Sequence, residues 1–254
     1  MIPDTDIPPL DDPDSVEATV HLRTRIEHSL EAPDDCSEFI LDLNFGIFGA
    51  WFSDTEYLDQ HEVSLGEIRL QLIRVSAALE DGIPLGELFD VSQSVYDLFA
   101  ALFDGDFEYS PNILKQFDTA NSCSDLFFLR HMILEPWARK QRLGLAIVRK
   151  LLLNWSSGCS LAVLKPHPLQ SHPDCYDPDE WEYYQFDKLP QDLNASKKRL
   201  RSYFAQLGFK SVKDCPYMLL PLGLIGPEAD DLDIPESVHI PPRIAKSVEQ
   251  GLVT

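Results

Sequence analysis

Three cations and a glycine lie close together in the middle of the chain, where they could bind a phosphate group. Arg139, Lys140, Arg142 and Gly144 follow an apolar run over residues 126–134 and precede a segment whose apolar residues have helical spacing. Unpaired backbone N–H groups and the helix dipole attract anions at a helix N-terminus. The cations add direct charge, and glycine, which has no Cβ, lets the backbone approach a ligand closely. The pattern predicts a diphosphate-binding turn between a strand and a helix.

This turn resembles the acyl-CoA loop of the GNAT superfamily of N-acyltransferases, which is written (Gln/Arg)-x-x-Gly-x-(Gly/Ala) and cradles the pyrophosphate of acetyl-CoA. Two registers fit the pattern. Gln141-Arg-Leu-Gly144-Leu-Ala146 matches it literally, whereas Arg139-Lys-Gln-Arg142-Leu-Gly144 has Arg142 in place of the first glycine. We favour the second register because it places Pro136 three residues before the first cation, as in the family's Val-x-Pro-x-x-Arg approach. It also starts the helix at the expected point.

A second segment resembles the other hallmark of the GNAT superfamily, a helix that ends in Tyr-x-x-Leu-Gly-Phe. Residues 197–209 read KKRLRSYFAQLGF, and Gly208 is a typical stop residue just past the last helical turn. Phe209 then opens a pair of strands that ends near residue 221. The two motifs follow each other in the family's order. The resemblance implies an α/β (α+β) fold of GNAT type, a mixed, mainly antiparallel sheet with flanking helices and an extended N-terminal β region.

Hydrophobic periodicity gives the expected elements. Strands are predicted at 17–30, 38–52, 67–77, 126–134 and 160–164, a helix from Pro84 to before Asp104, and a short helical turn at 111–118. The expected organisation is a flexible acidic tail at 1–16, a GNAT-like domain at 17–221 and an extended tail at 222–254. Within that domain, residues 125–221 form the motif-bearing core and residues 171–193 an acidic insertion.

The resemblance implies transfer of an acetyl group from acetyl-CoA, the co-substrate, to a primary amine. Because the thioester is already activated, the enzyme needs no nucleophile of its own. By position, the backbone of Met132 and Leu134 would hold the pantetheine arm and polarise the carbonyl. The remaining cofactor-binding residues would be Arg139, Gln141, Arg142, Leu143, Gly144 and Leu145.

The proton-transfer groups have several candidates. In the family a tyrosine just before x-x-Leu-Gly-Phe protonates the leaving thiolate, but this chain has Phe204 there, with Tyr203 about 100° away round the helix. Either Tyr203 turns in, or water serves, or turnover is weak or absent. The family's base is often a glutamate on the central strand or a water chain. Here the candidates are His131, whose pKa suits the task, and Glu135. Their structural alternatives are a hydrogen-bonded core histidine and a surface carboxylate paired with Arg139.

The net charge of the chain limits the classes of partner that it can bind. The net charge of −21 argues against a nucleic-acid partner. It suits a cationic amine acceptor, a small molecule or a lysine-rich protein, but acidity can also serve solubility alone. The insertion at 171–193 has seven acidic residues, one lysine and interleaved aromatics. It is interpreted either as an acceptor-binding lip using cation–π contacts or as a packed surface loop.

The remaining signals bear on location and on other classes of function. No apolar run reaches membrane-spanning length, the N-terminus does not resemble a signal peptide, and the five cysteines form no C-x-x-C pair, which indicates a cytoplasmic protein. His172, Asp174, Cys175 and Asp177 match no strong zinc pattern, so no metal is expected. Two alternatives stay open: a weakly active acyl-CoA-binding or sensing module, and an acidic interaction partner without CoA binding.

Overall fold

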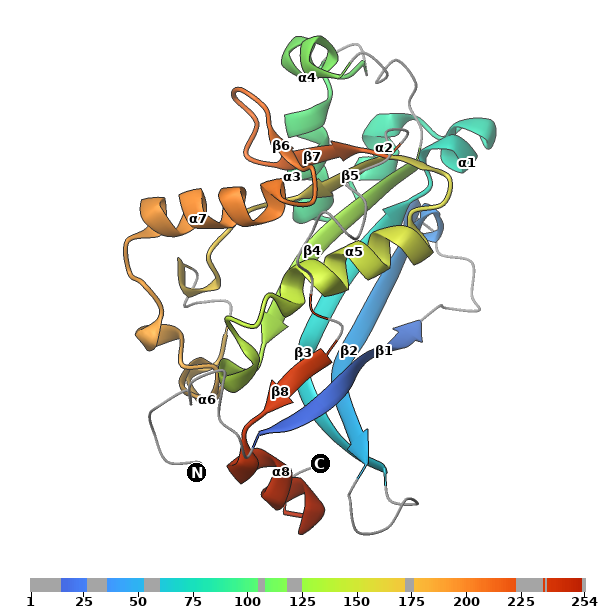
Figure 1. The fold of residues 1–254 in the computed structure, drawn as a ribbon. Coiled ribbons are helices and arrows are strands. Elements are labelled where there is room, and N and C mark those ends of the chain that lie inside the picture. Colours follow the sequence, from blue (N-terminus) through green and yellow to red (C-terminus); the bar gives the residue numbers. More distant parts are fainter. Residues whose placement is uncertain are drawn as a thin grey trace.

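The sheet is the centre of the molecule. In the computed structural model, which describes residues 15–26, 36–52, 60–104, 108–117, 125–171, 176–222, 235 and 237–252, eight strands form one sheet in the order β6-β7-β5-β4-β3-β2-β1-β8 (Figure 1). All neighbouring pairs are antiparallel except β4 and β5. The strands are β1 Val16–Ile26, β2 Ile40–Phe52, β3 Gln60–Ile73, β4 Asp125–Leu134, β5 Cys159–Leu164, β6 Lys210–Ser211, β7 Met218–Pro221 and β8 Ser237–Ile240. The expected mixed α+β class with a mainly antiparallel sheet is confirmed.

Helices lie on both faces of the sheet (Figure 1). Between β3 and β4 the chain forms α1 Val75–Glu80, α2 Leu85–Phe89, α3 Gln93–Leu102 and α4 Pro111–Gln116. The later helices are α5 Leu143–Trp155, α6 Pro178–Tyr183, α7 Leu193–Ala205 and α8 Pro242–Glu249, with 3-10 turns η1 Cys36–Phe39, η2 Pro136–Ala138, η3 Leu169–Ser171 and η5 Phe186–Lys188. Among the described helices, none combines the length and the apolar character needed to cross a membrane.

Alternation along each strand builds one core on each face of the sheet. In β4, Phe127 and Leu129 lie in the core that contains α5, whereas Leu126 and Phe128 lie in the core that contains α1–α4. On α5, Leu145 and Val148 are buried against the first of these cores. The two cores hold β4 and the start of α5 rigidly, and these are the elements that carry the candidate site.

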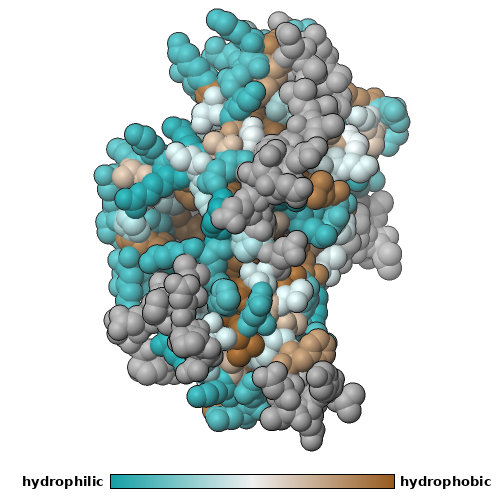
Figure 2. Space-filling view, in the orientation of Figure 1, coloured by the Kyte–Doolittle hydropathy of each residue, from teal (hydrophilic) through white to brown (hydrophobic). Residues whose placement is uncertain are grey.

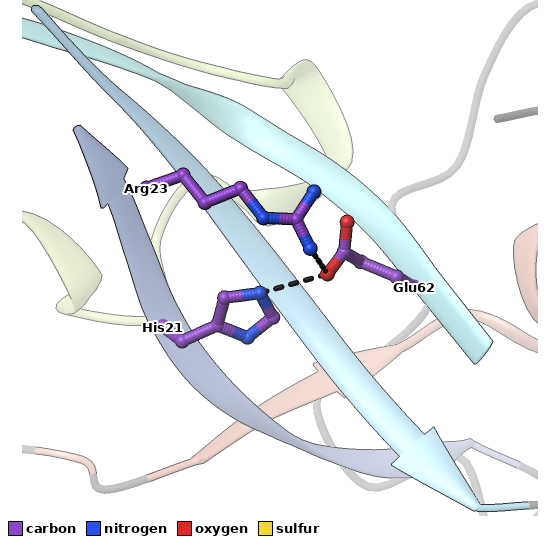
Figure 3. A network of polar contacts seen from close by, with 3 residues as sticks. All are labelled: His21, Arg23 and Glu62. Atoms are coloured by element: carbon purple, nitrogen blue, oxygen red, sulfur yellow. Dashed lines mark hydrogen bonds and ion pairs between the residues drawn. The ribbon is translucent and has the colours of Figure 1, made fainter. Parts of the chain in front are cut away.

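The sheet also presents polar side chains on the face opposite α5. On β1, His21 Nε2 lies 2.8 Å from Glu62 Oε2 of β3, and Arg23 donates to the same oxygen (Figure 3). The ring of Phe48 on β2 stacks against His21, and the Arg23 guanidinium lies 4.8 Å from that ring's centroid. The contacts cross β2, and they therefore tie β1 to β3.

Several boundaries differ from the sequence expectation. The helix expected between Pro84 and Asp104 is divided into α2 and α3, because Ser92 is extended and accepts a hydrogen bond from the Val95 N–H as a new N-cap. The strand expected at 67–77 begins earlier, at Gln60, and ends at Ile73. The following residues form α1 instead.

The expected extended tail at 222–254 is wrong over residues 237–249. These residues form β8, which pairs with β1, and α8. Val238, Ile240, Ile244 and Ala245 are buried in the core beside α5, and this apolar burial stabilises the segment as folded structure. Most of the expected N-terminal tail, residues 1–14, lies outside the described residues, and Val16 already belongs to β1.

Candidate functional site

The central feature of the site is a free edge on β4. Parallel pairing with β5 runs from Asp125↔Cys159 to Leu129↔Leu164, while β4 continues to Leu134. The register with β3 shifts at the same place, so that Arg130 forms a bulge. A bulge bends a strand and ends regular pairing. Beyond Leu129, the backbone groups on the β5 side of β4 are therefore left for partners other than β5.

The turn that follows β4 has an unusual backbone. Lys140 has φ 68° and Arg142 has φ 59°, both in the left-handed region. They are two of the four described non-glycine residues with positive φ. Such a conformation costs roughly 1–2 kcal/mol per L-residue and concentrates at ligand sites. Turns of this kind direct successive backbone N–H groups into a concavity that holds anions. Arg142 is the N-cap of α5, so the turn leads directly into a helix N-terminus.

Two of the side chains that were predicted to bind a cofactor are engaged elsewhere. Arg139 donates from Nε to the Leu134 carbonyl at 3.0 Å and from Nη2 to the Tyr184 carbonyl at 2.8 Å. Its guanidinium also lies over the Phe186 ring, and burial lowers its pKa. Gln141 pairs with the backbone of His239 in β8. Both side chains hold the turn in place, so they position the backbone.

Arg142 stands at the mouth of the turn. Its Nη2 donates to Gln206 Oε1 at 2.9 Å, which ties the start of α5 to the end of α7. The side chain is part-exposed, and Lys140 beside it is exposed. Leu143 and Leu145, also predicted to bind cofactor, bury their side chains in the core, so only their backbone can serve a ligand.

Gly144 is enclosed by two predicted site residues. A Cβ at Gly144 would lie 2.8 Å from the Tyr203 hydroxyl and 2.9 Å from Met132 Cε. The Leu145 N–H donates to the Tyr203 oxygen at 3.0 Å. Because the oxygen accepts from the backbone, the phenol proton points elsewhere. Burial raises the pKa of Tyr203, against opposing contributions from Leu145, Arg142 and Gly144. Tyr203 is thus a neutral phenol between β4 and the α5 N-terminus.

Phe204, at the position of the family's tyrosine, lies in the core. Its ring is buried beside Phe209 and in edge contact with Tyr203. Tyr203, one residue earlier, therefore faces the loop. Sequence reasoning gave the angular offset between the two residues, but it could not give the rotation of α7 about its axis.

His131 and Glu135 lie in different surroundings. His131 is opposite Arg69 across the β3–β4 ladder, on the sheet face away from Met132. Burial lowers the pKa of His131, with Arg69 and Arg130 acting in the same direction and Glu67 against it. The imidazole is therefore neutral at pH 7.

Glu135 is a buried carboxyl, only 7% exposed. Tyr183 donates to its Oε1 at 3.1 Å, and its own N–H donates to the Leu65 carbonyl at 2.9 Å. Burial raises its pKa, whereas the Tyr183 hydrogen bond and the charge of Arg139 oppose that rise. Burial and the Glu135 charge raise the pKa of Tyr183 to about 12. Glu135 is thus an anchor for α6 at the end of β4.

The acidic insertion contains α6 and the 3-10 turn η5 within residues 176–193. Asp177 and Glu180 form a capping box at the start of α6. Phe186 is fully buried, with the rings of Tyr176, Trp181 and Tyr184 around it. The packed-loop interpretation therefore holds for Phe186, while the acidic side chains of α6 face solvent. His172, Asp174 and Cys175 lie outside the described residues.

The surface has a hollow at this place. Figure 2 shows it between α7 and the α6 region, with hydrophobic atoms at its bottom. In the same orientation, the end of β4 and the start of α5 are seen between α7 and α6 (Figure 1). Met132, Leu134 and Tyr203 are part-exposed residues that pack against the core here.

The chain matches no protein-family model, no curated protein and no solved structure.

Sequence reasoning missed three contributors to the site. Tyr183 binds Glu135, Gln206 binds Arg142, and the His239 backbone binds Gln141. Each lies 48 or more residues from its partner in the chain. No local pattern signals these contacts, because they depend on how distant elements pack.

Proposed function

We propose that this chain is an N-acyltransferase of GNAT type that transfers an acetyl group from acetyl-CoA to a primary amine. One observation carries the proposal: the free edge of β4 leads directly to a cationic turn and a helix N-terminus. The left-handed φ of Arg142 supports the register from Arg139 to Gly144, because the family pattern has its first glycine at that position. In this register, the diphosphate lies on the α5 N-terminus beside Lys140 and Arg142.

The direction of β4 orients the rest of the ligand. Residues 130–134 span about 16 Å at roughly 3.3 Å per residue. An extended arm that starts at the α5 N-terminus and follows this edge brings the thioester near Leu129 to His131. Met132 offers backbone groups along the way, whereas the Leu134 carbonyl is already bound by Arg139. The apolar bottom of the hollow suits the arm (Figure 2).

Both proton transfers of the reaction are assigned to the thioester end of the site. The neutral amine nitrogen attacks the thioester carbon, the C–S bond breaks, and the amine loses a proton. We assign His131 as the proton acceptor, because it lies at the thioester end and its lowered pKa keeps the imidazole neutral. Glu135 lies at the diphosphate end and holds α6. Tyr203 also lies at the diphosphate end, where the Leu145 N–H holds its oxygen, so the leaving thiolate takes its proton from the protonated His131.

The acceptor is proposed to be a cationic amine, either a small molecule or a protein side chain. The acidic side chains of α6 are exposed, and Tyr176 places a ring 6.4 Å from the His131 ring. Negative charge beside aromatic rings attracts ammonium groups. An acceptor approaching from this side would meet His131 on its own face of the sheet.

Calorimetry with acetyl-CoA, followed by thiol release with a panel of amines, tests the proposal. Reversing the exposed Lys140 and the part-exposed Arg142 together, Lys140→Glu with Arg142→Glu, should weaken acetyl-CoA binding by about 10-fold or more, because charge-assisted contacts to the diphosphate are lost. The control is Lys198→Glu, an exposed cation on α7. Equal affinity in the double variant and the control would refute the loop assignment.

A second candidate function is an acyl-CoA-binding or sensing module. The burial of Phe204 at the family's tyrosine position favours it, because no hydroxyl stands there. Such a protein should bind CoA in calorimetry yet release no thiol with any amine in the panel.

A further inference from the structure

The C-terminal strand β8 reaches the candidate diphosphate turn. It pairs antiparallel with β1 from Val16↔Ile240 to Thr19↔Ser237, and it contacts η2, the turn just after β4. Val238 and Ile240 are fully buried, so the strand is anchored in the core on one side. The sheet order makes β8 an edge strand. Its second edge therefore has backbone groups that need partners.

Gln141 supplies those partners. The His239 N–H donates to Gln141 Oε1 at 2.9 Å, and Gln141 Nε2 donates to the His239 carbonyl at 3.1 Å. The N–H and the carbonyl of His239 both point away from β1 to make these bonds. His239 and Glu17, the residue opposite it on β1, therefore form a non-hydrogen-bonded pair of the antiparallel ladder. The Gln141 side-chain amide thus makes the two hydrogen bonds that a neighbouring strand would make at this edge of β8.

Gln141, which pairs with the His239 backbone, lies in the middle of the candidate diphosphate turn. The residue stands between Lys140 and Arg142, the two left-handed residues of the turn. A strained backbone persists only where its surroundings hold it. Gln141 joins the turn to an edge strand that is itself fixed by the core, and it does so from the middle of the strained segment.

We propose that Gln141 is a positioning residue, which clasps the turn to β8 and so couples anion binding by the turn to docking of the C-terminal segment. This inference rests on the proposed function, because it assigns the anion site to the turn. The side chain of Gln141 itself touches no ligand, because both ends of its amide are bound to His239. The C-terminal segment acts through it as a regulatory element of the site, since anything that detaches β8 loosens the turn.

Coupling of this kind is reciprocal. If CoA binds the clasped turn better than the released one, CoA must also favour the docked state of β8 by the same factor. Two neutral hydrogen bonds correspond to a combined factor of about 5- to 100-fold. The expected signature is slower hydrogen exchange of the His239 amide when CoA is bound.

The experiment compares Gln141→Met with the parent chain by two measurements. Met has similar length and makes neither hydrogen bond. Exchange of the His239 amide, followed by NMR without ligand, should speed up about 5-fold or more, and calorimetry should show CoA binding weakened by about 5- to 100-fold. In the parent, CoA should slow His239 exchange, and in Gln141→Met it should slow it less. The control is Gln93→Met, a side-chain amide on α3 that donates to Asp97 and lies far from β8.

The outcomes separate the two proposals. If Gln141→Met binds CoA as tightly as the parent, or leaves His239 exchange unchanged, the clasp is refuted while the proposed function stands. If the parent binds no CoA, the proposed function falls, and so does the coupling. Exchange of His239 would then show only whether Gln141 holds β8.

Discussion

Replacing Arg142 by glycine should give a more stable protein than replacing it by alanine. Both changes remove the same guanidinium and its 2.9 Å bond to Gln206, so these losses cancel in the comparison. The φ of 59° remains for either residue. Alanine there retains the left-handed penalty of roughly 1–2 kcal/mol, and glycine does not. Glycine loses about 0.5–1 kcal/mol more through its flexible unfolded chain, which leaves roughly 0.5–1 kcal/mol in its favour.

That difference is measurable. At about 2–4 °C of Tm per kcal/mol for a domain of this size, the glycine variant should melt about 1–4 °C above the alanine variant. Urea unfolding gives the same comparison as a free energy. The matched control is Arg149, within α5, where the order should reverse because glycine is about 1 kcal/mol worse than alanine inside a helix. An Arg142→Ala variant at least as stable as Arg142→Gly would refute the left-handed turn, and with it the preferred register of the loop.

Three further predictions follow from the site. Gly144→Ala should destabilise the fold by about 1–3 kcal/mol in urea unfolding, because the added Cβ would meet Tyr203 and Met132. Adding Tyr203→Phe should recover part of this loss. A Gly144→Ala variant more stable than the parent would contradict the contact. With His131 as the proton acceptor, kcat/KM for the amine should fall as pH drops through a pKa below 6.5. His131→Gln should remove this acidic limb from the plot of kcat/KM against pH. If the variant keeps the limb, His131 is not the proton acceptor. The raised pKa of Glu135 means that the folded state holds its proton more tightly than the unfolded chain does. Stability should therefore fall as pH rises above 4.5 towards that pKa. Glu135→Gln should flatten this part of the curve of Tm against pH. If the curve of the variant is as steep as that of the parent, the prediction is wrong.

Local patterns in the sequence were sufficient for the elements that carry the site. The apolar run before Glu135 is β4, the stripe that begins at Leu145 is α5, and the helix before Gly208 is α7. These predictions succeeded because periodicity and turn chemistry act between residues a few positions apart. The N-terminus of α5, and so the place of the candidate anion site, could be read from the chain in the same way.

Only the tertiary structure decided what the individual side chains do there. Arg139, expected to bind the diphosphate, is bound to the Leu134 and Tyr184 carbonyls, and Gln141 is bound to His239. Residues 237–249, expected to be an extended tail, became β8 and α8 through pairing with β1. The physical reason is the same in each case. A side-chain hydrogen bond or an edge strand depends on which distant segment packs beside it, and the sequence near a residue carries no record of that neighbour.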